Sequence, residues 1–528
     1  MTRPRHSGLR TALAFSLAVL GALSTARADS APNTIARIAD ATTEMDLERA
    51  TRLLDTAVGD ATALAFERAR LAVYSADCDA AQALLSAPAL AETREGASLA
   101  AVAGGCARAT AAGFVVEDKA RGIWLRLQDD GDRVLAPFLF DVADKARSTV
   151  GAELGADLPR PLRIDLVRDL FSLSAVSGLP LEAAETTGTL AIARFGRVIM
   201  LSPRAPKAGY PFEDTLAHEI THLFVTRATR DHAPLWLQEG VAKRLESHWR
   251  PARPFDDPDW ADVTARRALE NGTSVGIDAL GPSIAMLPTP EAASTAFAEV
   301  TSFITHFVAE KGKPALGLLF HDMKGLDEGK ADAALRSVSG YSLSEWNRLW
   351  QKALLEVPAR DPRAERRELK APSDYGKLAR LMRLGDLMFD RGALAAAERR
   401  YDAALEVAPA EAIVRFRAAR TRLARRDIEG AKQVLGDDTS VSSDHGGWLA
   451  LRARIAAEEG KLELARTLLS RAVGLDPLAE VVACEGYFEL PKSEPPAPVR
   501  PARPTSPEFA QLCDGVRNDP GRTSGRDG

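Results

Sequence analysis

Apolar residues recur every three or four positions along most of this chain, and this spacing predicts amphipathic helices. Between residues 29 and 112 the chain is rich in alanine, and its short apolar stripes are separated by polar turns. One stripe contains Leu47, Ala50 and Leu54, and another contains Ala69 and Val73. We therefore expect residues 29–112 to form a small helical domain.

Near Gly113 the pattern changes, and runs of β-branched and aromatic residues predict strands. The runs are residues 114–118, 122–128, 161–167 and 189–203, and the last should form two strands joined at Phe195-Gly196-Arg197. Residues 133–154 have helical periodicity between them. A mixed sheet is therefore expected in this part of the chain.

After Glu246 the pattern is mostly helical again as far as about Pro358. One amphipathic helix is expected to start at the polar residue Ser294. Another follows Ser342, where Ser342 and Glu345 have the spacing of a capping box. Residues 361–377 are charged and flanked by proline, so we expect a linker there.

A 34-residue period then appears. Three sets of positions keep this step: Gly392, Arg426 and Gly460; Ala397, Ala431 and Ala465; Tyr401, Leu435 and Leu469. The pattern resembles three tetratricopeptide repeats, at about 378–411, 412–445 and 446–479, within a domain at 378–484. A similar but degenerate repeat pair is suggested for 29–112. Such repeats imply a surface for a peptide or protein partner, and the alternative is a helical cap that only supports its neighbour.

The two ends of the chain are not expected to belong to the folded domains. Residues 1–28 have arginines, an apolar run of about fourteen residues and the motif Ala26-Arg27-Ala28, which predict a signal peptide cleaved after Ala28. The mature protein should then be periplasmic or secreted. No other apolar run approaches eighteen residues, so no membrane insertion is expected after cleavage. Residues 485–528 are rich in proline and should be disordered, apart from any tether through Cys513.

The net charge bears on the expected partners, and the cysteine content bears on the expected disulfides. The net charge is only −5, and no basic patch with interleaved aromatic residues appears, so nucleic acid is not an expected partner. The four cysteines allow pairing between sequence neighbours, Cys78 with Cys106 and Cys484 with Cys513. Two other connectivities, and free buried thiols, remain open alternatives.

The candidate chemistry lies at His218-Glu219-x-x-His222, with Glu239 on the following helical segment. Positions i and i+4 share one face of a helix, so both imidazoles can reach one metal ion. Two histidines and one glutamate leave the fourth position of a tetrahedral zinc ion open, as a catalytic site requires. Glu219 would be the general base. Two incidental histidines on a surface helix are the alternative.

This stretch resembles the gluzincin metallopeptidases, in which HExxH is followed by a glutamate on the next helix. Trp236-Leu237-Gln238-Glu239-Gly240-Val241-Ala242 is similar to the W-L-x-E-G-x-A of aminopeptidase N-type enzymes, and the layout is closest to exported peptidase MA-like domains. The resemblance implies an α+β metallopeptidase at 113–360, with a mixed sheet, the HExxH helix and a helical subdomain, flanked by all-α helical-repeat domains. It implies one zinc ion per chain, bound by His218, His222 and Glu239. It also implies that the last strand before the helix, 197–203, runs along the cleft, although an ordinary buried strand is the alternative.

Two family features are missing from the sequence. Nothing resembles the G-A-M-E-N stretch that holds a free amino terminus, so exopeptidase specificity is not indicated. The residue that stabilises the oxyanion is not marked by a motif, and Tyr210, Tyr341, His232 and His306 are candidates.

The function expected from these features is an exported zinc metallopeptidase that hydrolyses peptide bonds of a peptide or protein substrate. The alternatives are a periplasmic repeat scaffold whose peptidase-like domain is inactive or only stabilised by metal, and a zinc hydrolase of a non-peptide amide.

Overall fold

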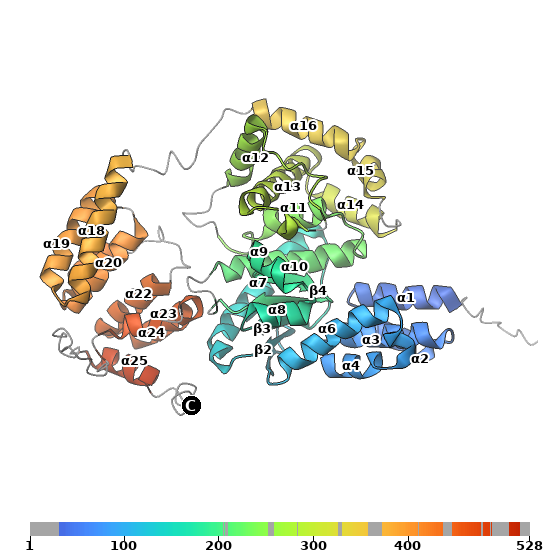
Figure 1. Ribbon diagram of the computed structural model, residues 1–528, viewed down its shortest axis with the longest axis horizontal. Helices are drawn as coiled ribbons and strands as arrows, with labels where there is room; N and C mark the ends of the chain where they lie inside the picture. Colours follow the sequence, from blue (N-terminus) through green and yellow to red (C-terminus); the bar gives the residue numbers. More distant parts are fainter. Residues whose placement is uncertain are drawn as a thin grey trace, which may run out of the picture.

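The computed structural model shows a mostly helical chain with one small mixed sheet (Figure 1). It describes residues 31–203, 205, 210–251, 258–281, 283–325, 330–356, 372–409, 411–436, 446–476, 479–485, 487 and 506–517. The expected signal peptide, residues 1–28, lies outside the described residues. None of the described helices is long and apolar enough to cross a membrane.

The amino-terminal part is helical, as expected. Its helices are α1 (Ala31–Thr43), α2 (Leu47–Thr56), α3 (Ala61–Tyr74), α4 (Cys78–Leu85), α5 (Pro88–Ala91) and α6 (Arg94–Thr110). Aspartates at the starts of α2, α3 and α4 accept backbone N–H bonds and so satisfy donors that a helix leaves unpaired. A disulfide between Cys78 and Cys106 joins α4 to α6, which confirms the pairing between sequence neighbours.

The sheet has five strands in the order β1-β2-β3-β5-β4. The strands are β1 (Phe114–Asp118), β2 (Ile123–Leu127), β3 (Leu162–Val167), β4 (Ala191–Arg194) and β5 (Arg197–Leu201). β2, β3 and β5 are parallel, whereas β1 and β4 pair antiparallel with their neighbours, which confirms the predicted mixed sheet. Phe195 and Gly196 form the turn between β4 and β5, both with positive φ (53° and 70°), as a tight right-twisted hairpin requires.

The strand order corrects one expectation. The last strand before the HExxH helix, β5, is paired on both sides, by β3 and β4, and all five of its residues are buried. The sheet edge on this side is therefore β4. The chain turns back at the hairpin and places the earlier strand outermost, which local sequence does not reveal.

Helices cover the sheet and continue into a helical subdomain. Near the sheet lie η1 (Asp130–Leu135), α7 (Ala136–Leu154), α8 (Leu170–Ser177), α9 (Leu181–Thr187), α10 (Phe212–Thr229) and α11 (Leu235–Leu245). The helical subdomain contains α12 (Trp260–Asn271), η2 (Ile284–Met286), α13 (Pro290–Lys311), α14 (Pro314–Lys324), α15 (Ala331–Ser339) and α16 (Leu343–Glu356). One continuous core connects both sets.

Two helix starts test the capping predictions. The capping box at α16 is confirmed, because the Ser342 N–H donates to the Glu345 carboxylate at 2.8 Å and the Glu345 N–H donates to the Ser342 hydroxyl at 3.3 Å. The expected start of α13 at Ser294 is wrong. The helix begins at Pro290, because the Thr289 hydroxyl caps it by accepting the Ala292 N–H.

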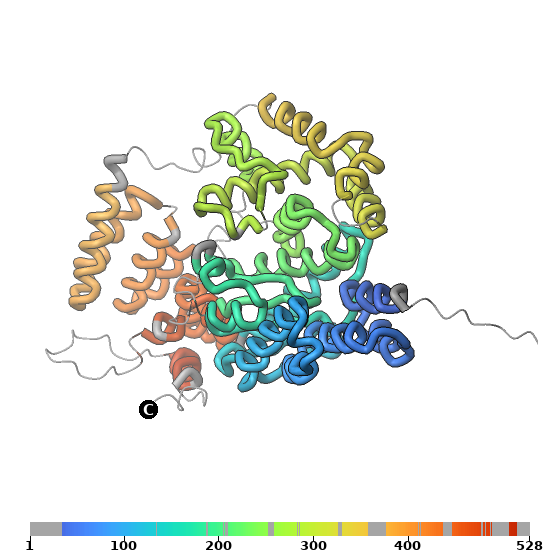
Figure 2. Tube along the Cα trace, turned by 45° about the vertical axis from the view of Figure 1, so that its right-hand side comes forward, coloured from blue at the N-terminus to red at the C-terminus, as the bar shows by residue number. Residues whose placement is uncertain are grey.

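The repeat region forms three successive helical hairpins (Figure 2). They are α18 (Pro372–Asp390) with α19 (Leu394–Val407), α20 (Ala412–Ala424) with α21 (Ile428–Leu435), and α22 (Gly446–Glu458) with α23 (Leu462–Leu475). The periodic positions have matching environments. Gly392, Arg426 and Gly460 all have positive φ at the hairpin turns, and Ala397, Ala431 and Ala465 are all fully buried.

The boundaries of this region need two corrections. The expected linker 361–377 is too long, since α18 already begins at Pro372, and residues 361–371 lie outside the described part. The expected disordered tail contains a helix, α25 (Pro507–Arg517). Phe509 and Leu512 are buried when α25 packs on α22 and α23, and this burial stabilises a helix that local composition does not predict. The tether through Cys513 is confirmed by its disulfide with Cys484, which follows α24 (Ala479–Ala483).

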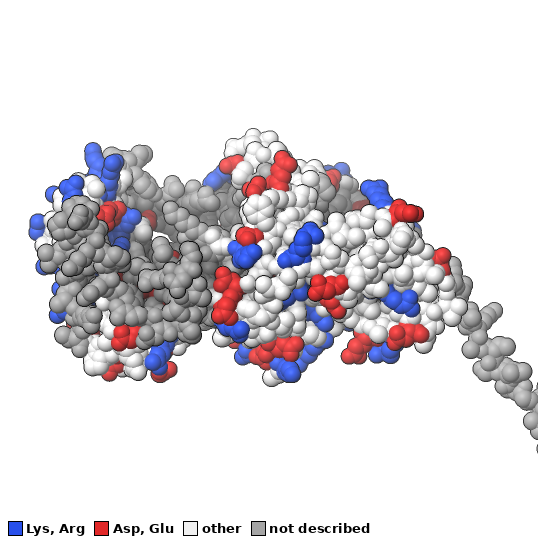
Figure 3. Space-filling view, turned by 60° about the horizontal axis from the view of Figure 1, so that its bottom comes forward, with Lys and Arg blue, Asp and Glu red and all other residues white. Residues whose placement is uncertain are grey.

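On the face shown in Figure 3, acidic and basic side chains are interspersed, in keeping with the net charge of −5.

Candidate metal centre

Two successive helices, α10 and α11, carry the candidate site. The apolar face of α10, with Leu216, Ile220 and Leu223, is buried in the core, and this fixes the direction in which His218 and His222 point. The helix ends at Arg230, whose φ of 54° reverses the chain, and α11 starts directly after Pro234. The chain therefore returns across the same face of α10.

The structure brings the three predicted ligands together. The two Nε2 atoms of His218 and His222 are 3.1 Å apart, and each is 3.5 Å from Oε2 of Glu239. Ligands about 2.1 Å from a tetrahedral ion lie about 3.4 Å from one another. The separation of the three atoms therefore fits a single ion of zinc size, and their chemistry is a set of donors that zinc accepts.

The other nitrogen of each imidazole has a partner on or just after α11. Nδ1 of His222 lies 3.2 Å from the Gln238 amide oxygen, and Nδ1 of His218 lies 3.3 Å from the Glu246 carboxylate. The second carboxylate oxygen of Glu246 is 2.6 Å from the Lys243 ammonium. Such partners orient a metal-binding imidazole and raise its basicity.

Gln238 and Glu246 were not predicted from the sequence. A signal for Glu246 does exist, because it follows Glu239 by seven positions and so lies on the same helix face two turns later. Gln238 lies one position before the ligand and has no comparable periodic signal.

Burial and charge set the protonation of the ligand cluster. Burial disfavours a charged imidazole, yet the carboxylates of Glu239 and Glu246 outweigh this effect and raise the pKa of His218. Burial alone would raise the pKa of Glu239, but the two imidazoles lower it well below its usual range. The cluster therefore attracts positive charge, which a divalent cation would supply.

Glu219 lies beside the three predicted ligands. Its side chain is buried, and its carboxylate accepts a hydrogen bond from the backbone N–H of Ala193 on β4. Burial raises the pKa of Glu219, although His222 and His218 oppose this shift. The structure thus leaves a carboxylate of increased basicity next to the three ligand atoms.

A cavity of about 500 Å³ opens over these residues. Its lining includes residues 188–193 of β4 and the preceding turn, Phe297 of α13 and Ser283 beside η2. In an antiparallel ladder, hydrogen-bonded and non-hydrogen-bonded pairs alternate, and the bond from Leu201 N–H to Leu190 C=O fixes the register here. The N–H and C=O groups of Ala191 and Ala193 therefore point away from β5, toward the open edge.

The four oxyanion candidates do not line this cavity. The Tyr210 hydroxyl is buried and donates to the Leu201 carbonyl. His232 lies against the Met323 carbonyl at 3.3 Å. Tyr341 and His306 pack on the Trp346 ring. Among the described residues, the ammonium group that lines the cavity belongs to Lys243.

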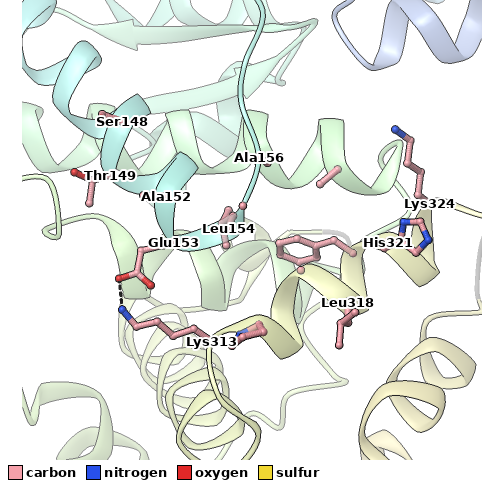
Figure 4. A pocket seen from close by; sticks show the side chains of 15 residues that line it. Ser148, Thr149, Ala152, Glu153, Leu154, Ala156, Lys313, Leu318, His321 and Lys324 are labelled. Carbon is pink, nitrogen blue, oxygen red and sulfur yellow. Dashed lines mark hydrogen bonds and ion pairs between the residues drawn. The ribbon is translucent and has the colours of Figure 1, made fainter.

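A second hollow of about 1040 Å³ lies between α7 and α14, away from the histidine pair (Figure 4). The ion pair between Glu153 and Lys313, 2.7 Å long, lies at its side, and His321 also lines it. It is larger than the cavity over the ligands, but it has no comparable group of metal donors among the described residues. Chemistry, rather than size, identifies the candidate site.

Comparisons with protein-family models, with curated proteins and with solved structures return no match for this chain.

Proposed function

We propose that this chain is an exported zinc-dependent metallopeptidase of the gluzincin type, with tetratricopeptide repeats that bind a substrate or partner protein. One observation carries the proposal: two histidine nitrogens and a glutamate oxygen from successive helices lie 3.1–3.5 Å apart, the spacing of ligands around a tetrahedral ion. The two disulfides are compatible with export to an oxidising compartment.

When bound, zinc would supply Lewis-acid activation of a water molecule and of the scissile carbonyl. Glu219 is the residue that takes the proton from the attacking water and later returns it to the leaving amine. Its burial favours this role, because a raised pKa makes the carboxylate a stronger base. The hydrogen bond from Ala193 N–H holds the carboxylate in place during both transfers.

The free edge of β4 would bind the substrate. The N–H and C=O of Ala191 and the C=O of Ala193 point toward the open edge beside His218, while the Ala193 N–H is bonded to Glu219, so an extended peptide can add to the sheet as a further strand through the remaining groups. This mode requires an unfolded segment, and it recognises backbone rather than a particular sequence.

Three variants of the mature protein test the proposal. Glu219→Gln should keep one zinc per chain but lose at least about 100-fold in cleavage of a peptide library, since general-base catalysis contributes on that order. His218→Ala should lose both zinc and cleavage. Glu153→Gln, the same change in the other hollow, is the matched control and should retain both. A chelator should abolish cleavage by the wild type, and added zinc should restore it.

The same measurements distinguish the alternative of a repeat scaffold. A wild-type protein that contains zinc but cleaves no peptide in the library would support a domain that is only stabilised by metal. Full activity of Glu219→Gln would contradict the proposed mechanism.

A further inference from the structure

The disulfide between α4 and α6 lies against a buried cluster of charges on the sheet. Nη2 of Arg126 is 3.7 Å from Sγ of Cys106 and 3.9 Å from Sγ of Cys78. Nη2 of Arg197 is also 3.7 Å from Sγ of Cys106. Two guanidinium groups from different strands therefore face one sulfur atom.

This cluster has an excess of positive charge. Asp165 is bound by both arginines, at 2.7 and 3.0 Å by Arg126 and at 2.8 Å by Arg197, so three charged groups sum to +1. Asp165 and Arg197 are almost fully buried, at 1% and 0% exposure, and Arg126 is 9% exposed. A buried charge without a counter-charge is costly, and a neutral disulfide cannot offset it.

Other groups around the sulfurs do not cancel this charge. Arg163, on the same strand as Asp165, is a further cation, and its pKa is lowered by burial and then by the charge of Arg197. Tyr74 of α3 also faces Arg197, and the side of Cys106 toward α8 is apolar. The carboxylates of Asp77 and Asp79 flank Cys78, but both residues are exposed to solvent.

We propose that Cys78–Cys106 is a redox-labile disulfide, opened by thiol–disulfide exchange with a small thiol or dithiol, whereas Cys484–Cys513 is a purely structural bond. The physical reason is that the thiolate of Cys106 supplies the counter-charge that Arg126 and Arg197 lack. Stabilising the reduced form of a disulfide raises its reduction potential.

The exchange has a defined direction. A thiolate of the reductant attacks Sγ of Cys78, which is at the first residue of α4 and is more exposed than Cys106 (5% against 1%). A bond forms between these two sulfurs, and the electron pair of the broken bond leaves on Sγ of Cys106. A second thiolate then attacks the reductant's sulfur in the mixed disulfide. The reductant is oxidised to its disulfide, and Cys78 leaves as a thiolate that takes a proton from water.

The second disulfide offers an internal comparison. Cys484 is followed by Glu485, whose carboxylate is paired with Arg420 at 2.8 Å, and Cys513 is followed by Asp514, which accepts a hydrogen bond from the Tyr487 hydroxyl at 2.6 Å. The buried guanidinium group in this region, that of Arg454, donates to the backbone carbonyls of Glu485 and Leu423 and lies over the Phe509 ring. The nearby cation Arg420 therefore has its own carboxylate partner, and a thiolate here would not supply a missing counter-charge, so this pair should resist reduction.

Equilibration of the folded protein in mixtures of reduced and oxidised dithiothreitol tests the proposal. After quenching, thiols are alkylated and each cysteine pair is quantified by mass spectrometry. Cys78–Cys106 should be half reduced at a reductant ratio at least tenfold lower than Cys484–Cys513, a difference of about 30 mV for a two-electron couple. Equal ratios, or the reverse order, would overturn the proposal.

Variants that remove a charge test whether the charge cluster, rather than exposure of the sulfur atoms, makes Cys78–Cys106 easier to reduce. Arg126→Met leaves a neutral pair of Asp165 and Arg197, and Cys78–Cys106 should then need at least a tenfold higher reductant ratio, with Cys484–Cys513 unchanged. Arg108→Met, an exposed change two residues from Cys106, should shift neither pair. An unaltered ratio in Arg126→Met would contradict the role of the charge cluster.

A third measurement does not depend on that variant folding. In Cys78→Ala, the thiol of Cys106 is titrated by the ultraviolet absorbance of the thiolate. It should be half ionised clearly below the usual value of about 8.5. A midpoint at or above this value would refute the proposal, whatever the outcome for peptide cleavage.

Discussion

At the scale of single residues, the partners of the two imidazoles determine how well a metal is held. Glu246→Gln and Gln238→Ala each remove or weaken a contact to the Nδ1 atom that faces away from the ligand cluster. We expect each change to lower zinc affinity about 10- to 100-fold without unfolding the protein. Competition with a fluorescent zinc chelator measures this, with Glu153→Gln as the control. Wild-type affinity in Glu246→Gln would show that Glu246 does not support His218.

Gly240, directly after the predicted ligand Glu239, is a second residue whose identity the packing dictates. A Cβ atom at this position would lie 2.6 Å from the backbone oxygen of Val300 and 2.6 Å from Cγ1 of Ile304. Replacing a helical glycine by alanine usually stabilises by about 1 kcal/mol, but overpacking against α13 costs about 1–3 kcal/mol.

Gly240→Ala should therefore lower the melting temperature and, because it shifts Glu239, weaken zinc binding. Gly317→Ala in α14 is the matched control, since its Cβ would meet the Leu154 oxygen at an ordinary 3.6 Å. A Gly240→Ala protein as stable as the wild type would mean that α11 and α13 separate easily.

At the scale of elements, β4 is predicted to be the substrate-binding strand. Ala191→Pro removes an N–H that points to the open edge and breaks no bond to β5, so stability should change little. One lost backbone hydrogen bond to substrate is worth about 0.5–1.5 kcal/mol, which corresponds to a roughly 2- to 12-fold loss in kcat/KM. Ile192→Pro, which removes an N–H paired with Ile199, should instead destabilise the fold. If Ala191→Pro cleaves peptides like the wild type, substrate does not pair with β4.

The elements also show what the sequence can and cannot predict. Residues 114–118 and 161–167 have strand patterns, and the HExxH segment has a helical one, because local periodicity reflects which face is buried. The order of strands is different, since it is decided by contacts between distant segments, and β5 was therefore expected to run along the cleft, where β4 lies instead. The helix α25 was missed for the same reason, because Phe509 is buried by segments distant in the sequence, α22, α23 and Tyr487.

In the candidate site too, local features could be predicted from the sequence, whereas contacts between distant segments could not. The spacing of His218 and His222 within one helix was sufficient to expect a shared face. The contact of Gln238 with His222 depends on how α10 and α11 cross, and the hydrogen bond from Ala193 to Glu219 depends on which strand lies outermost. No local sequence pattern shows how two helices cross or how strands are ordered, so the roles of Gln238 and Ala193 could be recognised only in the folded structure.

At the scale of the whole molecule, the helix that carries the histidines is held at both ends by flanking domains (Figure 1). At its amino-terminal end, Glu213 is paired with Arg471 of the last repeat hairpin at 3.1 Å. At its carboxyl-terminal end, Arg230 is paired with Glu44, which follows α1, at 2.6 Å. In both places the charge on α10 also suits the helix dipole. The flanking domains should therefore stabilise the site-bearing helix even though they contribute none of the predicted ligands.

The contact at Glu44 makes this coupling measurable through pH. Burial would raise the pKa of Glu44, but its bonds to Arg230 and to Lys324, the latter at 3.1 Å, lower it below the unfolded value of 4.5. A carboxyl group with a lowered pKa stabilises the folded state above its unfolded pKa, and the contribution disappears as the pH falls through the folded value. Glu44→Gln should thus cost about 1–2 kcal/mol at pH 7, because it removes one carboxylate partner from the partly buried cations Arg230 and Lys324, and the difference from wild type should vanish in acid.

Hydrogen exchange of the backbone amides of α1 and of the last turn of α10, at neutral and at acidic pH, measures this difference on both sides of the contact. Glu48→Gln is the control, since the Glu48 side chain is 91% exposed and its removal should change exchange at neither pH. Faster exchange in α1 alone would mean that the amino-terminal helices loosen without affecting the site helix. Faster exchange in both helices at pH 7, together with weaker zinc binding, would show that the docking of this domain affects the predicted ligands through α10.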